Sequence, residues 1–127
     1  MRILLDTHIF LWAITKDHRL KSSQRSHYLN PANELYLSVA SIWEILIKSS
    51  SGKLPLSLPA AQYIEAQMDA NRIQPLAIDF THLAEFESLP PIHRDPFDRM
   101  PIAQARAEKM PILSSDFKLR QYDVPLL

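Results

Sequence analysis

Six carboxylates follow or flank short apolar segments of this chain, and they are the residues best suited to chemistry. They are Asp6, Glu44, Asp79, Asp95, Asp98 and Asp116. If the apolar segments are strands of one parallel sheet, their carboxyl ends meet at one edge and bring several acids within a few ångströms of each other. Acids that close need a compensating cation, and Mg²⁺ and Mn²⁺ prefer oxygen ligands. Such a cluster can activate water for phosphodiester cleavage, so the acids predict a metal-dependent phosphoryl-transfer site.

Each acid also has a structural explanation when it is considered alone. Asp6, Asp98 and Asp116 stand where the N-cap of a helix is expected, a role worth about 1 kcal/mol. Asp98 is then the cap of a helix that reaches about Lys109, and Pro101 falls in the first turn, where its missing N–H costs nothing.

Glu44 has two structural explanations of its own. If the helix starts at Ser41, the segment from Ser41 to Glu44 fits the capping box S-x-x-E. Lys48 is placed for a favourable i,i+4 ion pair with Glu44. On a helical wheel Glu44 lies opposite an apolar side, where it is expected to be exposed to water. The apolar side consists of Val39, Ile42, Trp43, Leu46 and Ile47.

Short apolar segments alternate with helical segments from one end of the chain to the other. The expected strands are 3–5, 35–37, 75–78 and 112–114, with 124–127 as a further edge strand. The expected helices are 8–14, 39–49, 60–71, 81–88 and 98–109, with a short one after Asp116 and weak helical character in 20–33. This alternation predicts an α/β layer fold around a mainly parallel sheet.

Composition narrows the remaining possibilities. A chain of 127 residues predicts a single domain over 1–127, and no segment is apolar for long enough to span a membrane. The absence of cysteine excludes thiolate chemistry, and a single glycine, Gly52, disfavours phosphate-binding loops and nucleophile elbows. The poor signal sequence predicts a cytoplasmic protein. Lys and Arg equal Asp and Glu at 14 each, so any nucleic-acid binding must use a local patch or metal ions.

Four blocks of the sequence resemble the PIN domain, in particular the VapC-type toxins of bacterial toxin–antitoxin pairs. The blocks are ILLDTHIFLWA, LYLSVASIWEILIK, HRDPFDRMPIAQA and ILSSD, in the family's order. They carry, in turn, Asp6 with Thr7, then Glu44, then Asp98, and then Asp116 with Ser114 and Ser115. The resemblance covers nearly the whole chain.

The resemblance implies an endoribonuclease on a three-layer α/β/α sandwich, with Mg²⁺ or Mn²⁺ held by Asp6, Glu44, Asp98 and Asp116. Thr7, Ser114 and Ser115 would then orient these acids by hydrogen bonds. It also implies a homodimeric toxin that a cognate antitoxin neutralises, and contact with operator DNA only through that antitoxin.

Several residues beside the acids have two interpretations. Asp95 is expected outside the metal site, as a supporting or structural acid paired with Arg94 or Arg99. His93, Arg94 and Arg99 are candidates for holding RNA phosphates, and equally for balancing the charge of the acids. His8 either faces the site or lies in the core or at the surface.

Two other classes of protein remain open from the sequence. An Asp after the first strand is also typical of aspartyl-phosphate phosphatases, although their D-x-D pattern would need an acid where His8 stands. A binding module with a degenerate site is the second alternative, and the presence of all four acids argues against it.

Overall fold

The computed structural model describes residues 1–127 and contains one central sheet of four strands. The strands are β1 (Arg2–Leu5), β2 (Glu34–Ser38), β3 (Ile73–Leu76) and β4 (Ile112–Leu113). Their order is β3-β2-β1-β4 and every pair is parallel, which confirms the predicted fold class. Strand β3 begins before the predicted 75–78. The predicted edge strand 124–127 is reduced to one bridge between Leu126 and Ile112.

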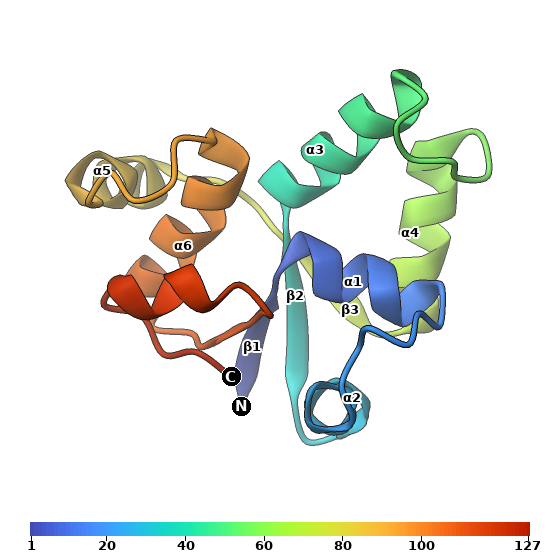
Figure 1. Ribbon diagram of the computed structural model, residues 1–127, viewed down its shortest axis with the longest axis horizontal. Coiled ribbons are helices and arrows are strands. Elements are labelled where there is room, and N and C mark those ends of the chain that lie inside the picture. The colour runs from blue at the N-terminus through green and yellow to red at the C-terminus, as the bar shows by residue number, and fades with distance from the viewer.

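The helices form a layer on each face of the sheet, so the molecule is the expected α/β/α sandwich (Figure 1). Helices α1 to α4 lie on one side, and α5, α6 and the 3-10 helix η1 lie on the other. The bounds are α1 Thr7–Ile14, α2 Ser22–Leu29, α3 Val39–Ser50, α4 Ala60–Ala70, α5 Phe80–Ser88, α6 Pro96–Glu108 and η1 Phe117–Gln121. None of these helices has the length and apolar character needed to cross a membrane.

The alternation of side chains along β1 divides the core into two apolar clusters. Ile3 and Leu5 pack with α1 and α4 on one face, whereas Leu4 packs with α6 on the other. All three side chains are fully buried. Because successive residues of a strand point to opposite faces, a run of three apolar residues fits a strand that is covered on both sides.

The order of the strands places a topological switch point between β1 and β4. The chain passes from β1 to β2 through α1 and α2 on one face, and it enters β4 from α6 on the other face. In open parallel sheets ligands bind beyond the carboxyl ends of the strands at such a point. Asp6 directly follows β1, and Asp116 comes shortly after β4.

Helix α6 begins earlier than expected, and the prediction that Asp98 is its N-cap is wrong. Asp95 is the cap, since its side chain accepts the backbone N–H of Phe97 at 2.8 Å, and Pro96 occupies the first turn. Proline favours that position because its φ is already helical and the N–H it lacks has no helical partner there. Asp98 therefore lies in the first turn. Pro101 lies inside the helix, where it cannot donate to the carbonyl of Phe97.

Helix α3 begins at Val39, as expected, so the capping box that a helix starting at Ser41 would have is not formed. Ser38 caps the helix by accepting the N–H of Ala40 at 3.0 Å, and Ser41 is buried within the helix. The buried face carries Glu44, which is only 7% exposed, whereas Trp43 is 60% exposed. The face of α3 that carries Glu44, which was predicted to be exposed to solvent, is thus the buried face.

The exposed apolar side of α3 lies close to the start of α6. Trp43 meets the ring of Phe97 edge to face, with 5.2 Å between the ring centroids. Val39 and Ile47 are exposed on the same helix. This contact joins the two helices that stand on either side of the switch point (Figure 1).

Candidate acidic active site

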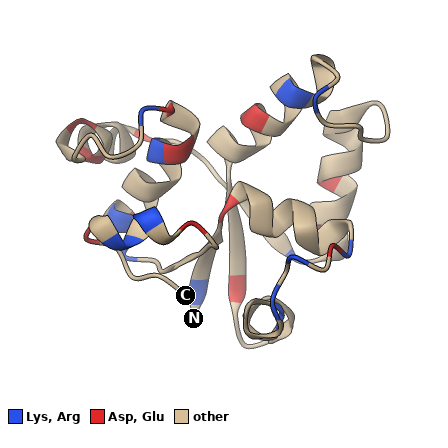
Figure 2. Ribbon diagram, in the orientation of Figure 1, with Lys and Arg blue, Asp and Glu red and all other residues tan.

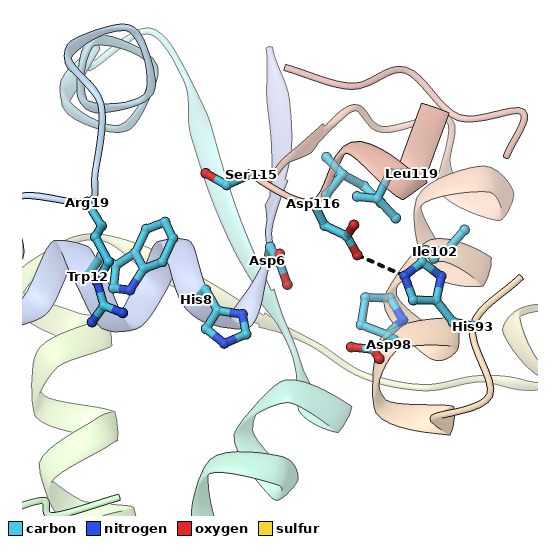
Figure 3. Close-up of a pocket in the computed structure, with 12 residues that line it drawn as sticks. Asp6, His8, Trp12, Arg19, His93, Asp98, Ile102, Ser115, Asp116 and Leu119 are labelled. Carbon is cyan, nitrogen blue, oxygen red and sulfur yellow. Dashed lines mark hydrogen bonds and ion pairs between the residues drawn. The ribbon is translucent and has the colours of Figure 1, made fainter. Parts of the chain in front are cut away.

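A cavity of about 360 Å³ opens beside the carboxyl ends of β1 and β4, and three carboxylates line it. They belong to Asp6 after β1, Asp98 in the first turn of α6, and Asp116 at the start of η1. Figure 2 shows acidic segments on α3, on α6 and at the start of α1, around this end of the sheet. The structure therefore brings three of the four predicted acids into one cavity (Figure 3).

Asp6 occupies the N-cap position of α1, but its side chain is directed at another partner. Its Oδ2 accepts a hydrogen bond of 2.6 Å from the hydroxyl of Ser114, and the carboxylate makes no capping bond. Burial raises the pKa of Asp6 above its usual value. The bond from Ser114 lowers it, and the charge of Asp116 adds a smaller increase. Ser114 was predicted to orient the metal-site acids, and it contacts two of them, since its Oγ also accepts the Asp116 N–H at 3.0 Å.

Asp116 is held by both of its carboxylate oxygens. Oδ1 accepts the backbone N–H of Lys118 at 3.0 Å, and Oδ2 lies 2.8 Å from Nε2 of His93. The other ring nitrogen of His93, Nδ1, lies 2.8 Å from the hydroxyl of Tyr122, and the two rings stack. With Nε2–H directed at the carboxylate, Nδ1 accepts the Tyr122 proton. This arrangement makes His93 a hydrogen-bond partner of Asp116 within the chain.

Asp98 differs from the other two acids because its carboxylate forms no hydrogen bond within the chain. Both carboxylate oxygens of Asp98 are therefore free to bind a ligand in the cavity. Burial raises its pKa most, and the charge of Asp95 raises it further. His93 lowers the pKa, and the charges of Glu44 and Asp6 add smaller increases.

Glu44 lies behind the cavity rather than in its lining. Thr7 donates its hydroxyl to Oε1 at 3.1 Å, and Lys48 donates its ammonium to Oε2 at 3.0 Å. The predicted i,i+4 pair with Lys48 is therefore present, and Thr7 supports this acid as expected. Both oxygens of Glu44 have partners, but its charge still acts on Asp98.

The remaining predicted residues contact other parts of the chain. Ser115 accepts a 2.7 Å hydrogen bond from Nε2 of Gln24, so its hydroxyl does not orient an acid. Asp95 caps α6 and forms no ion pair with Arg94 or Arg99.

Arg99 and Arg94 occupy very different positions. The guanidinium of Arg99 donates to four backbone carbonyls and lies 4.9 Å from the ring centroid of Phe86. The carbonyls belong to Phe86, Leu89, Pro90 and His93. These contacts tie the loop after α5 to α6. Arg94 is exposed and unpaired, so it is the more accessible of the two for a phosphate.

Three residues in the lining were not predicted or were left open by the sequence. His8 faces the cavity, and its ring lies 5.9 Å from that of Trp12. Arg19 covers Trp12, with 5.2 Å to the ring centroid, and binds Asp17, whose pKa its hydrogen bonds lower to about 2. The i,i+4 spacing of His8 and Trp12 after Asp6 was a signal for one helix face. Arg19, in a polar linker, had no such signal.

A second group of ionisable side chains, outside the cavity, has the tightest clustering in the chain. The ligand atoms of Asp79, His82 and Glu108 lie within 4.8 Å of one another. The contacts explain this group structurally, since His82 is buried, accepts the Asp79 N–H at Nδ1 and meets Glu108 at Nε2. The cavity acids do not form a group of three this tight, although they share one space.

The cavity acids fit a divalent cation. Three carboxylates line the space, and His93 and Arg19 are each engaged with an acid of their own. Burial and mutual repulsion raise the pKa of Asp6 and of Asp98, a cost that a bound cation would remove. An all-oxygen set without cysteine suits Mg²⁺ or Mn²⁺.

This sandwich with its acidic cavity defines the class of protein, and the family model for the PIN domain matches residues 3–125. The chain belongs to the PIN domain family, which confirms the family expected from the four blocks. It is 42% identical over 52 residues to Ribonuclease VapC16 of Mycobacterium tuberculosis. That match spans 41% of this chain and 37% of the relative.

Solved toxin–antitoxin structures share the fold over its whole length. The chain superimposes on VapBC2 from Rickettsia felis, bound to a DNA fragment from its promoter, with a TM-score of 0.74. It superimposes on VapBC-1 from nontypeable Haemophilus influenzae with a TM-score of 0.71. All of this chain is covered in both cases, against 98% and 97% of the other chain, at 17% and 18% identity. At these identities the likeness concerns the fold.

Proposed function

We propose that this protein is a Mg²⁺- or Mn²⁺-dependent endoribonuclease that acts as the toxin of a toxin–antitoxin pair. The observation that carries the proposal is the single cavity lined by Asp6, Asp98 and Asp116, three acids from three separate elements at the switch point of the sheet. The name of the VapC16 relative supports ribonuclease activity, and the acids support the cation.

The side chains of the cavity have distinct parts in this proposal. Asp6 and Asp98 hold the cation with Asp116, and Glu44 adds negative charge from behind. Ser114 keeps the Asp6 carboxylate turned into the cavity. A divalent cation bound here lowers the pKa of water and offsets charge that develops on the phosphate. Asp98 makes no hydrogen bond within the chain, so both of its oxygens are available to the cation.

The partners of the toxin are part of the same proposal. The solved structures that share the fold are toxin–antitoxin complexes, and one of them holds promoter DNA. We therefore assign this chain a cognate antitoxin, operator contact only through that antitoxin, a homodimeric state and a cytoplasmic location.

Cleavage of RNA by the purified, antitoxin-free chain tests the proposal. Cleavage is expected with Mg²⁺ or Mn²⁺ and is expected to stop in EDTA. Cleavage that persists in EDTA would contradict the cation requirement. A trapped phosphate on Asp6 together with hydrolysis of small phosphoesters would indicate an aspartyl-phosphate phosphatase instead. The absence of cation binding in calorimetry would indicate a binding module.

A further inference from the structure

A second cavity, of about 570 Å³, adjoins the acidic cavity and shares two residues with it. Ser115 and Asp116 line both spaces, so the second cavity begins where the acidic one ends. It extends between the start of α2 and η1 and includes Lys21, Phe117 and Arg120. The two spaces are therefore two parts of one surface path that passes Asp116.

The electrostatic character changes along this path. The acidic cavity contains three side-chain carboxylates, whereas Asp116 is the one acidic side chain of the second cavity, which also contains the cations of Lys21 and Arg120. Neither cation forms an ion pair within the chain. Figure 2 shows Lys and Arg on η1 and on the segment that leads into α2. Because the net charge of the chain is zero, such a local patch is what a polyanion would need.

Phe117 supplies a stacking surface within the same patch. Its side chain belongs to η1, lines the second cavity and is 71% exposed. Aromatic rings flanked by cations are the usual means of binding single-stranded nucleic acid, since every base has a face to stack and every linkage a phosphate to neutralise.

We propose that this second cavity binds the stretch of single-stranded RNA next to the scissile phosphate. Phe117 stacks on a base, Arg120 and Lys21 contact phosphates, and Asp116 marks the boundary with the acidic cavity. The inference rests on the proposed nuclease function and adds the position of the substrate strand. It assigns the binding of RNA to residues around η1, whereas His93 and Arg99 are engaged within the chain.

Binding of RNA without cleavage tests the path separately from the nuclease activity. A fluorescein-labelled single strand of about 12 nucleotides, within the range that single-strand sites cover, is titrated with the protein. Ca²⁺ replaces Mg²⁺, fluorescence anisotropy reports affinity over a series of salt concentrations, and a gel confirms that the strand stays intact. The variants are Phe117→Ala, Arg120→Ala and Lys21→Ala, and Arg120→Lys is the conservative variant.

The matched controls remove similar groups outside the cavity. Phe80→Ala removes an aromatic ring that is 84% exposed on α5 and does not line the second cavity. Lys118→Ala removes a cation from η1 that does not line the cavity. The midpoint of thermal unfolding verifies that every variant is folded, as expected for exposed side chains.

We expect Phe117→Ala to weaken RNA binding by about tenfold, within the range for a stacked base. We expect Arg120→Ala and Lys21→Ala each to reduce the slope of log K against log salt by about 0.7. Arg120→Lys should keep the slope, and both controls should bind like the unaltered protein.

The possible failures are distinguishable. If the protein cleaves RNA but all cavity variants bind RNA with unchanged affinity, the RNA path is wrong and the proposed nuclease function stands. The second cavity would then be assigned to the binding of a protein partner. If the unaltered protein neither binds nor cleaves RNA, both proposals are wrong.

Discussion

The hydroxyl of Ser114 lies 2.6 Å from Oδ2 of Asp6 and donates a hydrogen bond to it. The hydroxyl oxygen of Ser114 also accepts the N–H of Asp116 at 3.0 Å. One serine therefore joins the acid after β1 to the segment after β4, across the switch point of the sheet. The position of two cavity acids depends on this contact, and several outcomes can be expected from it and from its neighbours.

Replacement of Ser114 by alanine should weaken cation binding. Without the hydroxyl, Asp6 loses the donor that orients it, and supporting residues of this kind usually change metal affinity by about 10- to 100-fold. Calorimetric titration with Mn²⁺ measures the change. Ser115→Ala is the matched control, since that hydroxyl is bonded to Gln24 and should leave the affinity unaltered. Equal losses in both variants would contradict the assigned role of Ser114.

The two neighbouring acids of α6 should respond differently to loss of charge. Asp98→Asn removes a carboxylate from the cavity and should reduce RNA cleavage by on the order of 100-fold or more, the range for a positioned acid or base. Asp95→Asn should retain activity, because asparagine also caps helices and Asp95 does not line the cavity. Initial cleavage rates in Mg²⁺ compare the two. Full activity in Asp98→Asn would remove this residue from the site.

The contribution of the N-cap of α6 to the stability of the protein should be measurable. Asp95→Ala removes the acceptor for the Phe97 N–H and should lower the free energy of unfolding by about 1 kcal/mol. Urea denaturation measures this difference, and Asp95→Asn should recover most of it. A stability loss in Asp98→Ala of the same size would indicate that the cap had been misassigned.

The raised pKa of Asp6 predicts how the cation-free protein responds to pH. Between the ordinary pKa of an aspartate and the higher value of Asp6, the folded state keeps a proton that the unfolded state has lost. Stability contributed by this group therefore falls as pH rises through that window and stays lower above it. Asp6→Asn should be more stable than the unaltered protein at neutral pH, and the difference should shrink in acid.

Denaturation midpoints in a chelator across a pH series test this expectation. Asp17, whose pKa is lowered to about 2, has the opposite effect on stability, but it is present in both proteins and cancels. Addition of Mn²⁺ should stabilise the unaltered protein more than Asp6→Asn. A midpoint difference that does not change with pH would contradict the role of burial.

Much of the architecture could be predicted from local pattern. The run Ile3-Leu4-Leu5 is apolar at every position, as a strand covered on both faces must be, and it is the centre of the sheet. The errors concern where helices begin. Asp95 and Asp98 are both plausible caps in HRDPFDRM, and the preference of proline for the first helical position was the local signal that favoured Asp95.

The residues of the site were also predicted only in part from local pattern. Acid type and order indicated which side chains would carry the chemistry, because each acid follows or flanks an apolar segment. The helical periodicity, however, predicted that Glu44 lies on the solvent-exposed side of α3, because the apolar residues that include Trp43 were expected to form the buried face. In the fold, Thr7 and Lys48 satisfy Glu44, and that pairing makes its burial tolerable.

The sequence by itself therefore determined the fold class, the family and the identity of the acids, because these depend on residue type and on short-range periodicity. Only the tertiary structure decided which acids share a cavity and which residues hold them. It also decided that the path beyond Asp116 leads to Phe117 and Arg120. Those relationships join residues from separate elements, and no local pattern records which side chains meet when β4 is placed beside β1.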